Sequence, residues 1–461
     1  MTYSRAKQNL FPREFWIRML VIAFPIVLQN LLIASFRMVD TVFVGQLGDT
    51  FLAAIGLAGN VSYWMEMSAY GVAAGAAVFM TQYHGACDEQ GIYRTFSVIF
   101  LCVVPLGIIL SGVVFCAPRI PMTILTTSPD LIEEGAVYLR TASFSYLALA
   151  LSQIFCVTFR STEELVLPMV ATVASALTNI VLDYVLIFGK LGLAPMGIAG
   201  AGVATSVASW ITPLVIFLWS VKEKNILLRC FRHFGKAGSF FKEFWTRALP
   251  VLCNETFYGL SVVIMNMFYG RMGDDNFAAL TIYRSIENLL FVFFQGICTA
   301  CNVMIGKDVG AGQTETAHMN SKRFILLSPL LGLITGSIVI FFRKSIVYLF
   351  GASAVVGGIT EWLLIIYGID MGIKYISYIL ATGVFRASGD TKIALVSDLC
   401  VNYFLLLPII ILGYLLKLDF VLLFVIINVA EDISRNLILI IHWKRGEWIK
   451  PVTLPEGTRT H

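Results

Sequence analysis

Two aspartates and an asparagine lie inside long apolar runs of this sequence, where charged groups are costly. Asn179 and Asp183 are four residues apart in TNIVLDYVLIFG, so on a helix they share one face. Asp40 lies well past the middle of another apolar run. Two carboxylates that face each other at low dielectric cannot both stay ionised cheaply, so one takes a proton, binds a cation or pairs with a base. With the hydroxyl of Thr205, these groups predict an oxygen site suited to a proton or a hard monovalent cation and to no other metal.

Basic residues near several intramembrane acids leave a structural alternative open. Arg37 lies three residues before Asp40 and could neutralise it. In the second half of the chain, helical spacing predicts three local ion pairs: Asp370 with Lys374, Arg284 with Glu287, and Asp432 with Arg435. Paired charges of this kind are as often structural ties as ligands.

The second half also offers candidates for binding a substrate or a second ion. Glu255 has no partner nearby in the sequence and follows Pro250 by about one turn. Intramembrane charges are functional candidates by default, because they cost several kcal/mol unless paired or hydrated. The candidates are Glu255, Arg284, Asp370 and Asp398.

The composition requires a membrane around these residues. Of 461 residues, 58% are hydrophobic and 13% charged, against about 25% charged in soluble domains. The apolar runs are long and do not alternate with polar residues, so they predict helices, not a barrel. The net charge of +4 is no sign of nucleic acid binding. We therefore expect an all-α polytopic membrane protein.

Twelve transmembrane helices are predicted, six in each half of the chain. Their approximate ranges are 15–46, 52–82, 93–117, 134–159, 165–188, 196–220, 246–270, 277–306, 323–342, 359–385, 392–415 and 418–442. Connections are short, so successive helices should be antiparallel neighbours. Odd-numbered spans then run in one direction, which puts Asp40 and Asp183 at similar depth.

The two halves of the chain repeat each other. EFWIRMLVIAFP at the start of the first half returns as EFWTRALP in the second, and Pro25 corresponds to Pro250. The difference in residue number is 225 for this pair and again for Gly85 and Gly310, and it is 226 between Phe159-Arg160 and Phe385-Arg386. A nearly constant offset over such a distance indicates two homologous bundles.

This repeat predicts the domains and the symmetry. We expect an N-terminal lobe over 1–221, a basic cytoplasmic linker over 222–245 and a C-terminal lobe over 246–461. Six spans per half make both lobes enter the membrane the same way, so the two-fold axis runs along the membrane normal with a central cleft. With the N-terminus inside, most Lys and Arg residues fall in inner segments, which predicts a plasma membrane protein with both termini cytoplasmic.

Together these motifs resemble the multidrug and toxic compound extrusion (MATE) transporters. The features that carry the resemblance span nearly the whole chain: Pro25…Asp40…GQLG, FRST leading through Pro168 to TNIVLDYVLIFG, GIAGAGVAT, and FRASGDTK. The resemblance implies two six-helix bundles arranged as a V and alternating access between them. It implies export of cationic or amphipathic compounds in exchange for Na⁺ or H⁺, with no other cofactor.

The resemblance also assigns roles to residues. Asp40, Asn179 and Asp183 match the cation site of the family's first lobe, Thr205 matches a nearby hydroxyl, and Pro25 matches a proline that lets the first helix bend. One departure is Lys374-Tyr375, where some branches carry an acid, so a second-lobe ion site is left open. Membrane lipids and a small organic substrate are the expected partners, and a monomer suffices because one chain holds both lobes.

Two other functions fit parts of the sequence. A lipid-linked saccharide flippase of the wider superfamily would need arginines for pyrophosphate in the cleft, and Arg37, Arg140 and Arg284 keep that alternative open. A membrane enzyme or channel has less support, since no HExxH, GxSxG or intramembrane histidine cluster occurs in the sequence.

Overall fold

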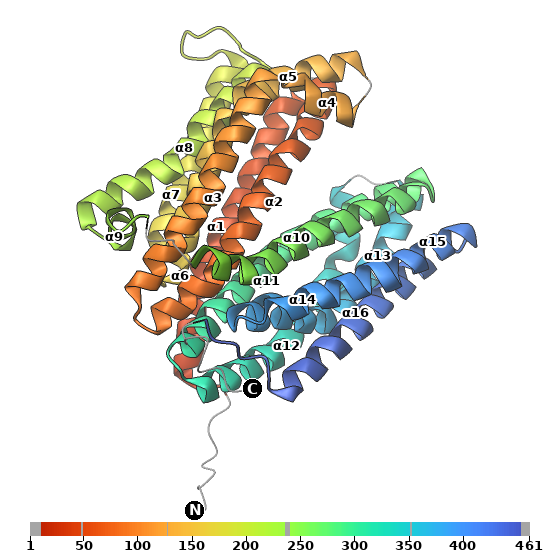
Figure 1. Cartoon of the computed structure of the whole chain (residues 1–461). Helices are drawn as coiled ribbons and strands as arrows, with labels where there is room; N and C mark the ends of the chain where they lie inside the picture. Colours follow the sequence, from red (N-terminus) through yellow and green to blue (C-terminus); the bar gives the residue numbers. More distant parts are fainter. Residues whose placement is uncertain (1–10, 48, 127, 236–239, 351–352, 453–461) are drawn as a thin grey trace, which may run out of the picture. The chain divides into compact units, whose positions relative to one another are not determined.

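The computed structural model describes residues 11–47, 49–126, 128–235, 240–350 and 353–452 (Figure 1). Within these ranges, only the backbone is described at residues 34–42, 45, 49–50, 52–53, 64–65, 68 and 274. The side chains of Arg37 and Asp40 therefore lie outside the described part of the structure. The regular secondary structure of the described residues is helical throughout.

The first half of the chain forms nine helices among the described residues. They are α1 (Arg13–Gly45), α2 (Asp49–Gly85), α3 (Glu89–Cys116), α4 (Arg119–Leu125), α5 (Pro129–Ala142), α6 (Phe144–Ser161), α7 (Val166–Phe188), α8 (Ile198–Glu223) and α9 (Ile226–Arg232). The short helices α4 and α9 lie between predicted spans, and α9 belongs to the basic linker.

The second half repeats this plan. They are α10 (Phe240–Gly270), α11 (Asp274–Gly310), α12 (Thr314–Leu349), α13 (Ala354–Tyr378), α14 (Thr391–Asp398), α15 (Leu407–Leu415) and α16 (Phe420–Arg445). Two π-helical segments continue them, η1 (Ile379–Phe385) after α13 and η2 (Leu399–Leu406) between α14 and α15.

Ten helices among the described residues are long and apolar enough to cross a membrane. The two remaining predicted spans coincide with α2 and α16. Several side chains of α2 lie outside the described part of the structure, and α16 carries three charged residues, Glu431, Asp432 and Arg435. The predicted fold class is confirmed as an all-α polytopic membrane protein with twelve spans in two six-helix bundles. The cleft between the bundles stays a prediction.

Some predicted spans are not uniform α-helices in the structure. The span predicted over 134–159 breaks at Ser143, whose hydroxyl donates to the Arg140 carbonyl at 2.7 Å, while Ser145 donates to the Ala142 carbonyl at 2.7 Å. Such hydroxyls compete with the backbone amides of the helix. The span predicted over 392–415 contains η2, which ends next to Pro408, a residue that cannot donate to the helical ladder.

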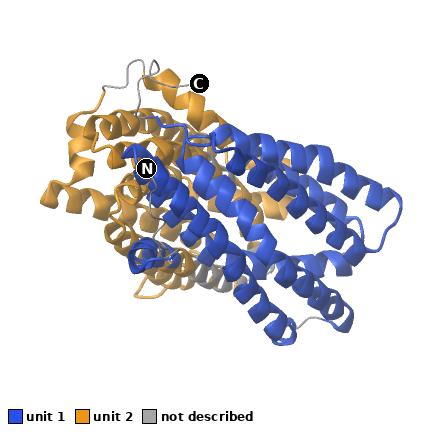
Figure 2. Ribbon diagram, turned by 90° about the horizontal axis from the view of Figure 1, so that it is seen from below, with its two compact units in different colours: residues 1–27, 253–461 blue, residues 28–252 orange. Residues whose placement is uncertain are grey.

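The packing divides the chain into two compact units (Figure 2). Unit 1 comprises Met1–Val27 and Cys253–His461, and unit 2 comprises Leu28–Leu252. The start of α1 therefore packs with the second half of the chain, and the start of α10 packs with the first half. The two lobes that the repeat predicts stay a prediction. The boundaries between the two compact units lie inside α1 and α10, the first helix of each predicted lobe.

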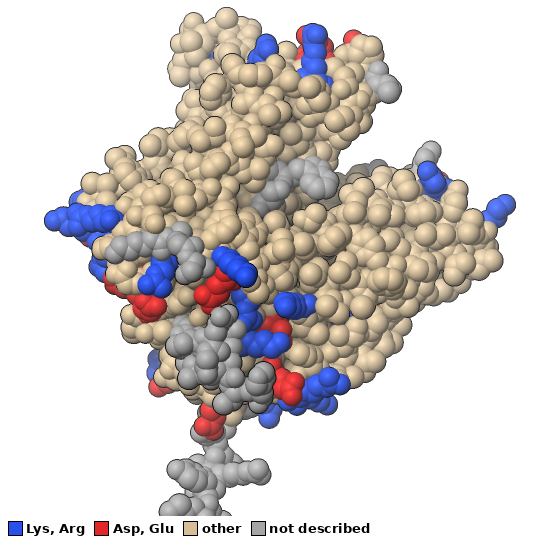
Figure 3. Space-filling view, viewed as in Figure 1, with Lys and Arg blue, Asp and Glu red and all other residues tan. Residues whose placement is uncertain are grey.

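The exterior is suited to lipid. Charged side chains on the face shown in Figure 3 gather towards the ends of the helices, and the wide surface between them carries almost none. Large apolar residues are exposed on the long helices, for example Ile109 on α3 at 60% and Leu330 on α12 at 54%. In water such surfaces would aggregate, whereas in a bilayer they contact acyl chains.

Candidate functional site

Helices α1 and α7 lie against each other in one register. Gln29 Nε2 on α1 donates to Thr172 Oγ1 on α7 at 2.7 Å, across 143 positions of sequence. Further along, the ring of Phe43 contacts the rings of Tyr184 and Phe188, with centroids 6.3 and 5.9 Å apart. Residue numbers rise along both helices in the same direction, so the two helices run parallel.

This register puts positions 40 and 183 at one level. Asp183 follows Asp40 by the same 143 positions that separate the bonded pair Gln29 and Thr172. Phe43, only about 4.5 Å further along the axis at 1.5 Å per residue, lies between Tyr184 and Phe188. The backbone thus agrees with the equal depth predicted from the sequence.

Asp183 is fully buried on α7, with 0% of its surface exposed. Asn179, one turn earlier, has a buried side-chain nitrogen without a hydrogen-bond partner in the described residues. Burial of an ionised carboxylate costs several kcal/mol unless a positive group or hydrogen bonds compensate it. The amide donor and the carboxylate on one helix face form a polar site inside the bundle.

The small residues of GIAGAGVAT let α8 approach this part of α7. A Cβ at Gly200 would lie 2.8 Å from the backbone carbon of Leu186, which is closer than real side chains come. The two helices run antiparallel, since Ser175 Oγ donates to the Ala208 carbonyl at 2.6 Å and Thr212 Oγ1 to that of Ala171 at 3.5 Å. Close backbone approach is what small residues provide in membrane bundles.

The same antiparallel register places Thr205 near the level of Asn179. Its hydroxyl donates to the carbonyl of Ala201 in its own helix at 2.9 Å. A hydroxyl that donates its proton still has lone pairs that can accept or coordinate. Asn179, Asp183 and Thr205 are therefore brought to one region of unit 2, together with position 40 of α1. Pro25 lies inside α1, four residues before Gln29.

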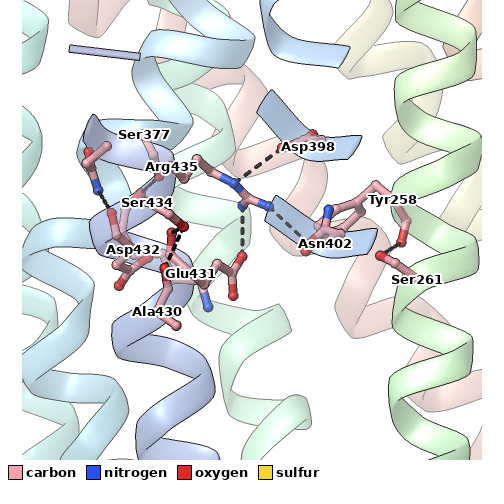
Figure 4. A network of polar contacts seen from close by, with 12 residues as sticks. Tyr258, Ser261, Ser377, Asp398, Asn402, Ala430, Glu431, Asp432, Ser434 and Arg435 are labelled. Carbon is pink, nitrogen blue, oxygen red and sulfur yellow. Dashed lines mark hydrogen bonds and ion pairs between the residues drawn. The ribbon is translucent and has the colours of Figure 1, made fainter. Parts of the chain in front are cut away.

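A second polar cluster lies between α14, η2 and α16 in unit 1 (Figure 4). Arg435 on α16 pairs with Glu431 at 2.8 Å and with Asp398 at 3.2 Å, and it donates to Asn402 Oδ1 at 3.3 Å. None of the three charged side chains is more than 14% exposed. Asp398, a candidate from the sequence, is thus tied to a base on another helix.

The local ion pairs predicted from spacing are wrong. Lys374 pairs with Glu287 of α11 at 3.3 Å and not with Asp370, and among the described residues no ion pair joins Arg284 to Glu287. Arg435 pairs with Glu431 and Asp398 and not with Asp432. Lys374 and Arg435 both reach an acid on a neighbouring helix, which spacing along one helix does not reveal, whereas Glu431 pairs with Arg435 within α16.

Two of the second-half candidates have a buried polar atom without a hydrogen-bond partner in the described residues. Asp370 is 8% exposed, and its Oδ2 has no hydrogen-bond partner in the described residues. The Nε of Arg284 is likewise buried without one there. Both were candidates from the sequence because they are charges inside apolar runs, whereas their spacing predicted ordinary ion pairs.

Glu255 has a partner that the sequence reasoning missed. Arg386, in the repeated Phe-Arg motif, donates to Glu255 Oε1 at 2.6 Å. From the sequence the motif is recognisable as a repeat but has no evident role. The sequence by itself does not reveal this pair: the offset of 226 shows only that Arg386 and Glu255 are equivalent to Arg160 and Gln29, which also form a hydrogen bond.

A small cavity adjoins this second cluster. Its volume is about 30 Å³, and it is lined by Asn254, Glu255, Tyr258, Ser377, Tyr378, Ala381, Thr382, Asp398 and Arg435. One water molecule needs roughly 10–15 Å³ of such volume, whereas drug-sized ligands occupy several hundred. The cavity can hold a water molecule or two beside the charges, and no organic substrate.

Comparison with known proteins identifies the family. The sequence model of the MatE family matches residues 25–185 and residues 250–415. The chain belongs to the MatE family. The two matched segments begin at Pro25 and Pro250, so the internal repeat and the resemblance seen in the sequence are both confirmed. MatE proteins are transporters, and the chain is a transporter and not an enzyme.

Relatives from bacteria and animals agree with this MatE assignment. The probable multidrug resistance protein NorM of Neisseria meningitidis is 25% identical over 364 residues, covering 76% of each chain. The multidrug and toxin extrusion protein 1 of Xenopus tropicalis is 25% identical over 438 residues, covering 88% of this chain and 71% of that one.

Solved structures share the fold. A MATE in the bent conformation has a TM-score of 0.83 at 18% identity and covers 93% of this chain and 94% of that one. A MOP superfamily transporter from Pyrococcus furiosus has a TM-score of 0.82 at 19% identity, with 94% and 96% covered.

Proposed function

We propose that this MatE transporter is an antiporter that exports organic cations, drugs or other amphipathic small molecules. Inward movement of Na⁺ or H⁺ would drive export by alternating access between the two sides of the membrane. The names of its relatives, multidrug resistance protein and multidrug and toxin extrusion protein, support the substrate class.

One observation supports the coupling site above all others. Asp183 is fully buried at the level of position 40, one turn from an asparagine whose side-chain nitrogen has no hydrogen-bond partner in the described residues. A second carboxylate at that level would raise the cost of keeping both ionised. A bound proton or Na⁺ lowers that cost, and Asn179 and Thr205 supply further oxygen atoms.

The proposed mechanism is competition, in which the coupling cation neutralises the negative charge of Asp40 and Asp183 and substrate is released. When the cation neutralises the Asp40–Asp183 pair, the conformation that favours substrate binding loses its electrostatic advantage, and substrate leaves. A ligand shifts such an equilibrium only by its differential affinity for the two states, and a few kcal/mol suffice. Pro25 supports the proposal, because a helix that lacks one hydrogen bond bends there more easily than elsewhere.

The second half supports the first-lobe assignment by contrast. Asp398 and Glu255 are already paired with arginines, so a cation would have to displace a tethered base. Asp370 and Arg284, each with a buried polar atom left over in the described residues, remain our candidates for contacting substrate. We place the coupling ion in the first lobe.

The remaining parts of the proposal concern the cell. The distribution of Lys and Arg supports a plasma membrane location with both termini in the cytoplasm. Two lobes in one chain support a monomer embedded in lipid.

The flippase alternative is weaker, because Arg140 donates to the Phe115 carbonyl at 3.2 Å and its guanidinium lies 5.9 Å from the centre of the Phe115 ring.

Transport assays in vesicles test the function. Efflux of a fluorescent organic cation is measured under an imposed Na⁺ gradient and, separately, under an imposed pH gradient. We expect one of the two gradients to drive efflux. Absence of efflux under both gradients, together with movement of a lipid-linked saccharide, would favour the flippase.

A further inference from the structure

In each half of the chain, the arginine of the Phe-Arg motif donates a hydrogen bond to the first helix of that half, and we call this bond the arginine tie. Arg160 Nη2 at the end of α6 donates to Gln29 Oε1 on α1 at 2.9 Å. Arg386 Nη2, just after η1, donates to Glu255 Oε1 on α10 at 2.6 Å. Both bonds span 131 positions of sequence, so the two ties are equivalent under the repeat.

Both ties lie just past the point where the first helix passes from one compact unit to the other. The boundary falls between Val27 and Leu28 on α1, and between Leu252 and Cys253 on α10. Gln29 is thus the second residue after the first boundary, and Glu255 the third after the second. Since each of these helices is continuous, α1 and α10 physically belong to both units.

The residue before each boundary makes an equivalent contact inside its own unit. A Cβ at Gly296 of α11 would come within 2.3 Å of Val27 Cγ2, and one at Gly71 of α2 within 2.7 Å of Leu252 Cδ1. Gly71 and Gly296 correspond under the repeat, as Val27 and Leu252 do, with the offset of Pro25 and Pro250. The glycines let each first helix lie directly on its neighbour at the crossing.

The beginnings of the two helices are also anchored. On α1, Arg18 pairs with Asp308 of α11 at 3.3 Å, and the ring of Phe15 meets that of Phe324 at 5.1 Å. On α10, Phe244 stacks on Phe79 of α2 at 5.6 Å. Each first helix is therefore fixed before the boundary to one unit and after it to the other.

A proline precedes each boundary by two residues. Pro25 and Pro250 lie inside α1 and α10 and cannot donate to the carbonyls of Val21 and Thr246. The helical ladder is thus interrupted between the anchored beginning and the arginine tie. A bend at either proline would then lie between two segments of one helix, each of which is held by contacts within its own unit.

We propose that Arg160 and Arg386 are positioning residues that set the two helix joints of the transport cycle, at residues 25–29 and 250–255. The idea of a cycle rests on the proposed function, whereas the ties themselves do not. Each guanidinium holds the first turn after the joint to its own bundle, so that bending is confined to the proline stretch. Without the tie, the bend would spread along the helix towards the polar site.

The two arginine ties have different acceptors, and this difference allows an experiment to distinguish a positioning role from a role in ion coupling. In the first half the acceptor is the amide oxygen of Gln29, and in the second half it is the carboxylate of Glu255. A neutral acceptor therefore suffices for the tie. Glu255→Gln should keep the tie, whereas Glu255→Met should remove it.

Hydrogen exchange read by mass spectrometry tests the ties without any transport assay. Arg160→Met should speed amide exchange in residues 28–33 of α1 about tenfold or more, and leave residues 253–258 unchanged. Arg386→Met should do the reverse. Tenfold corresponds to about 1.4 kcal/mol, near the lower end for a hydrogen bond to a charged group. Arg119→Met, which removes the exposed ion pair with Glu133, is the matched control and should change neither segment.

The outcomes decide the proposal separately from the function. Unchanged exchange in both arginine variants, or equally fast exchange in Glu255→Gln and Glu255→Met, would overturn it. If Arg386→Met does not fold, the two Glu255 variants make the same comparison.

In vesicles, Arg160→Met should lower the maximal efflux rate severalfold with little change in the half-saturating substrate concentration. Faster amide exchange in Arg160→Met together with efflux at the wild-type rate would contradict the proposal that Arg160 sets a joint used in transport. Wild-type protein without efflux would instead refute the proposed function.

Discussion

Gln29 on α1 and Thr172 on α7 are joined by a hydrogen bond of 2.7 Å whose sequence separation, 143 positions, is that of Asp40 and Asp183. The bond lies about three turns from the aspartate level along each helix. Because both helices are α-helical over this stretch, the bond fixes their relative height. The coupling site that we propose depends on this register.

Loss of the register should weaken ion coupling before it weakens folding. Thr172→Val removes two neutral hydrogen bonds, the one from Gln29 and one that the Thr172 hydroxyl donates to the Pro168 carbonyl of its own helix at 2.8 Å. Each costs about 1 kcal/mol of stability. We expect the cation concentration that half-saturates efflux to rise severalfold, because α1 can slide on α7. Thr178→Val on the same helix removes a hydroxyl that bonds to its own helix, at the Ala174 carbonyl at 2.8 Å, and is the control. Equal behaviour of the two variants would speak against a role for the register.

Neutralising either proposed coupling carboxylate should abolish transport without unfolding the protein. Asp183→Asn keeps the shape of the side chain, and the variant should still fold and insert in the membrane. Gradient-driven efflux should fall to background in Asp183→Asn and in Asp40→Asn. Asp130→Asn, on the exposed first turn of α5, should transport normally.

The close contact of α7 and α8 should be intolerant of added volume. Gly200→Ala puts a Cβ within 2.8 Å of the Leu186 backbone, so the helices must separate at a cost of about 1–3 kcal/mol. The melting temperature of the purified protein should fall accordingly. Gly112→Ala on α3, where no atom lies within 4 Å of the new Cβ, should leave it unchanged or raise it slightly.

The buried arginine of the second cluster should matter more for stability than any of its acids. Arg435→Met strands Asp398 and Glu431, and breaking a buried ion pair in this way costs about 3–5 kcal/mol. Adding Asp398→Asn and Glu431→Gln to Arg435→Met should recover part of the lost melting temperature, since no unpaired charge is left. A triple variant less stable than Arg435→Met would show that the acids stabilise the fold by themselves.

The spans and the repeat could be predicted because they depend on properties that extend over many residues. A long row of apolar residues has few alternatives to a membrane helix, and the offset of 225 between Pro25 and Pro250 needs no structure to be seen. The break at Ser143 was missed because two hydroxyl–carbonyl bonds, not composition, decide it.

The partners of the buried charges were harder to predict. Lys374 binds Glu287 on another helix, although Asp370 lies one turn away on its own helix. Which helix faces which is a property of the packed bundle, and side-chain spacing along one helix carries no information about it. The pair Glu255 and Arg386 could have been predicted from the repeat only after the equivalent pair, Gln29 and Arg160, had been seen in the structure.

The central claim is that a cation occupies the first-lobe site, and direct binding tests it best. Purified protein in detergent is titrated with Na⁺ at constant pH by calorimetry, and proton release or uptake is followed in parallel with a pH-sensitive dye. We predict that the wild-type chain binds one Na⁺, or takes up one proton as the pH falls, and that Asp183→Asn does neither. Binding of the same ion with the same affinity and stoichiometry in Asp183→Asn would contradict the account.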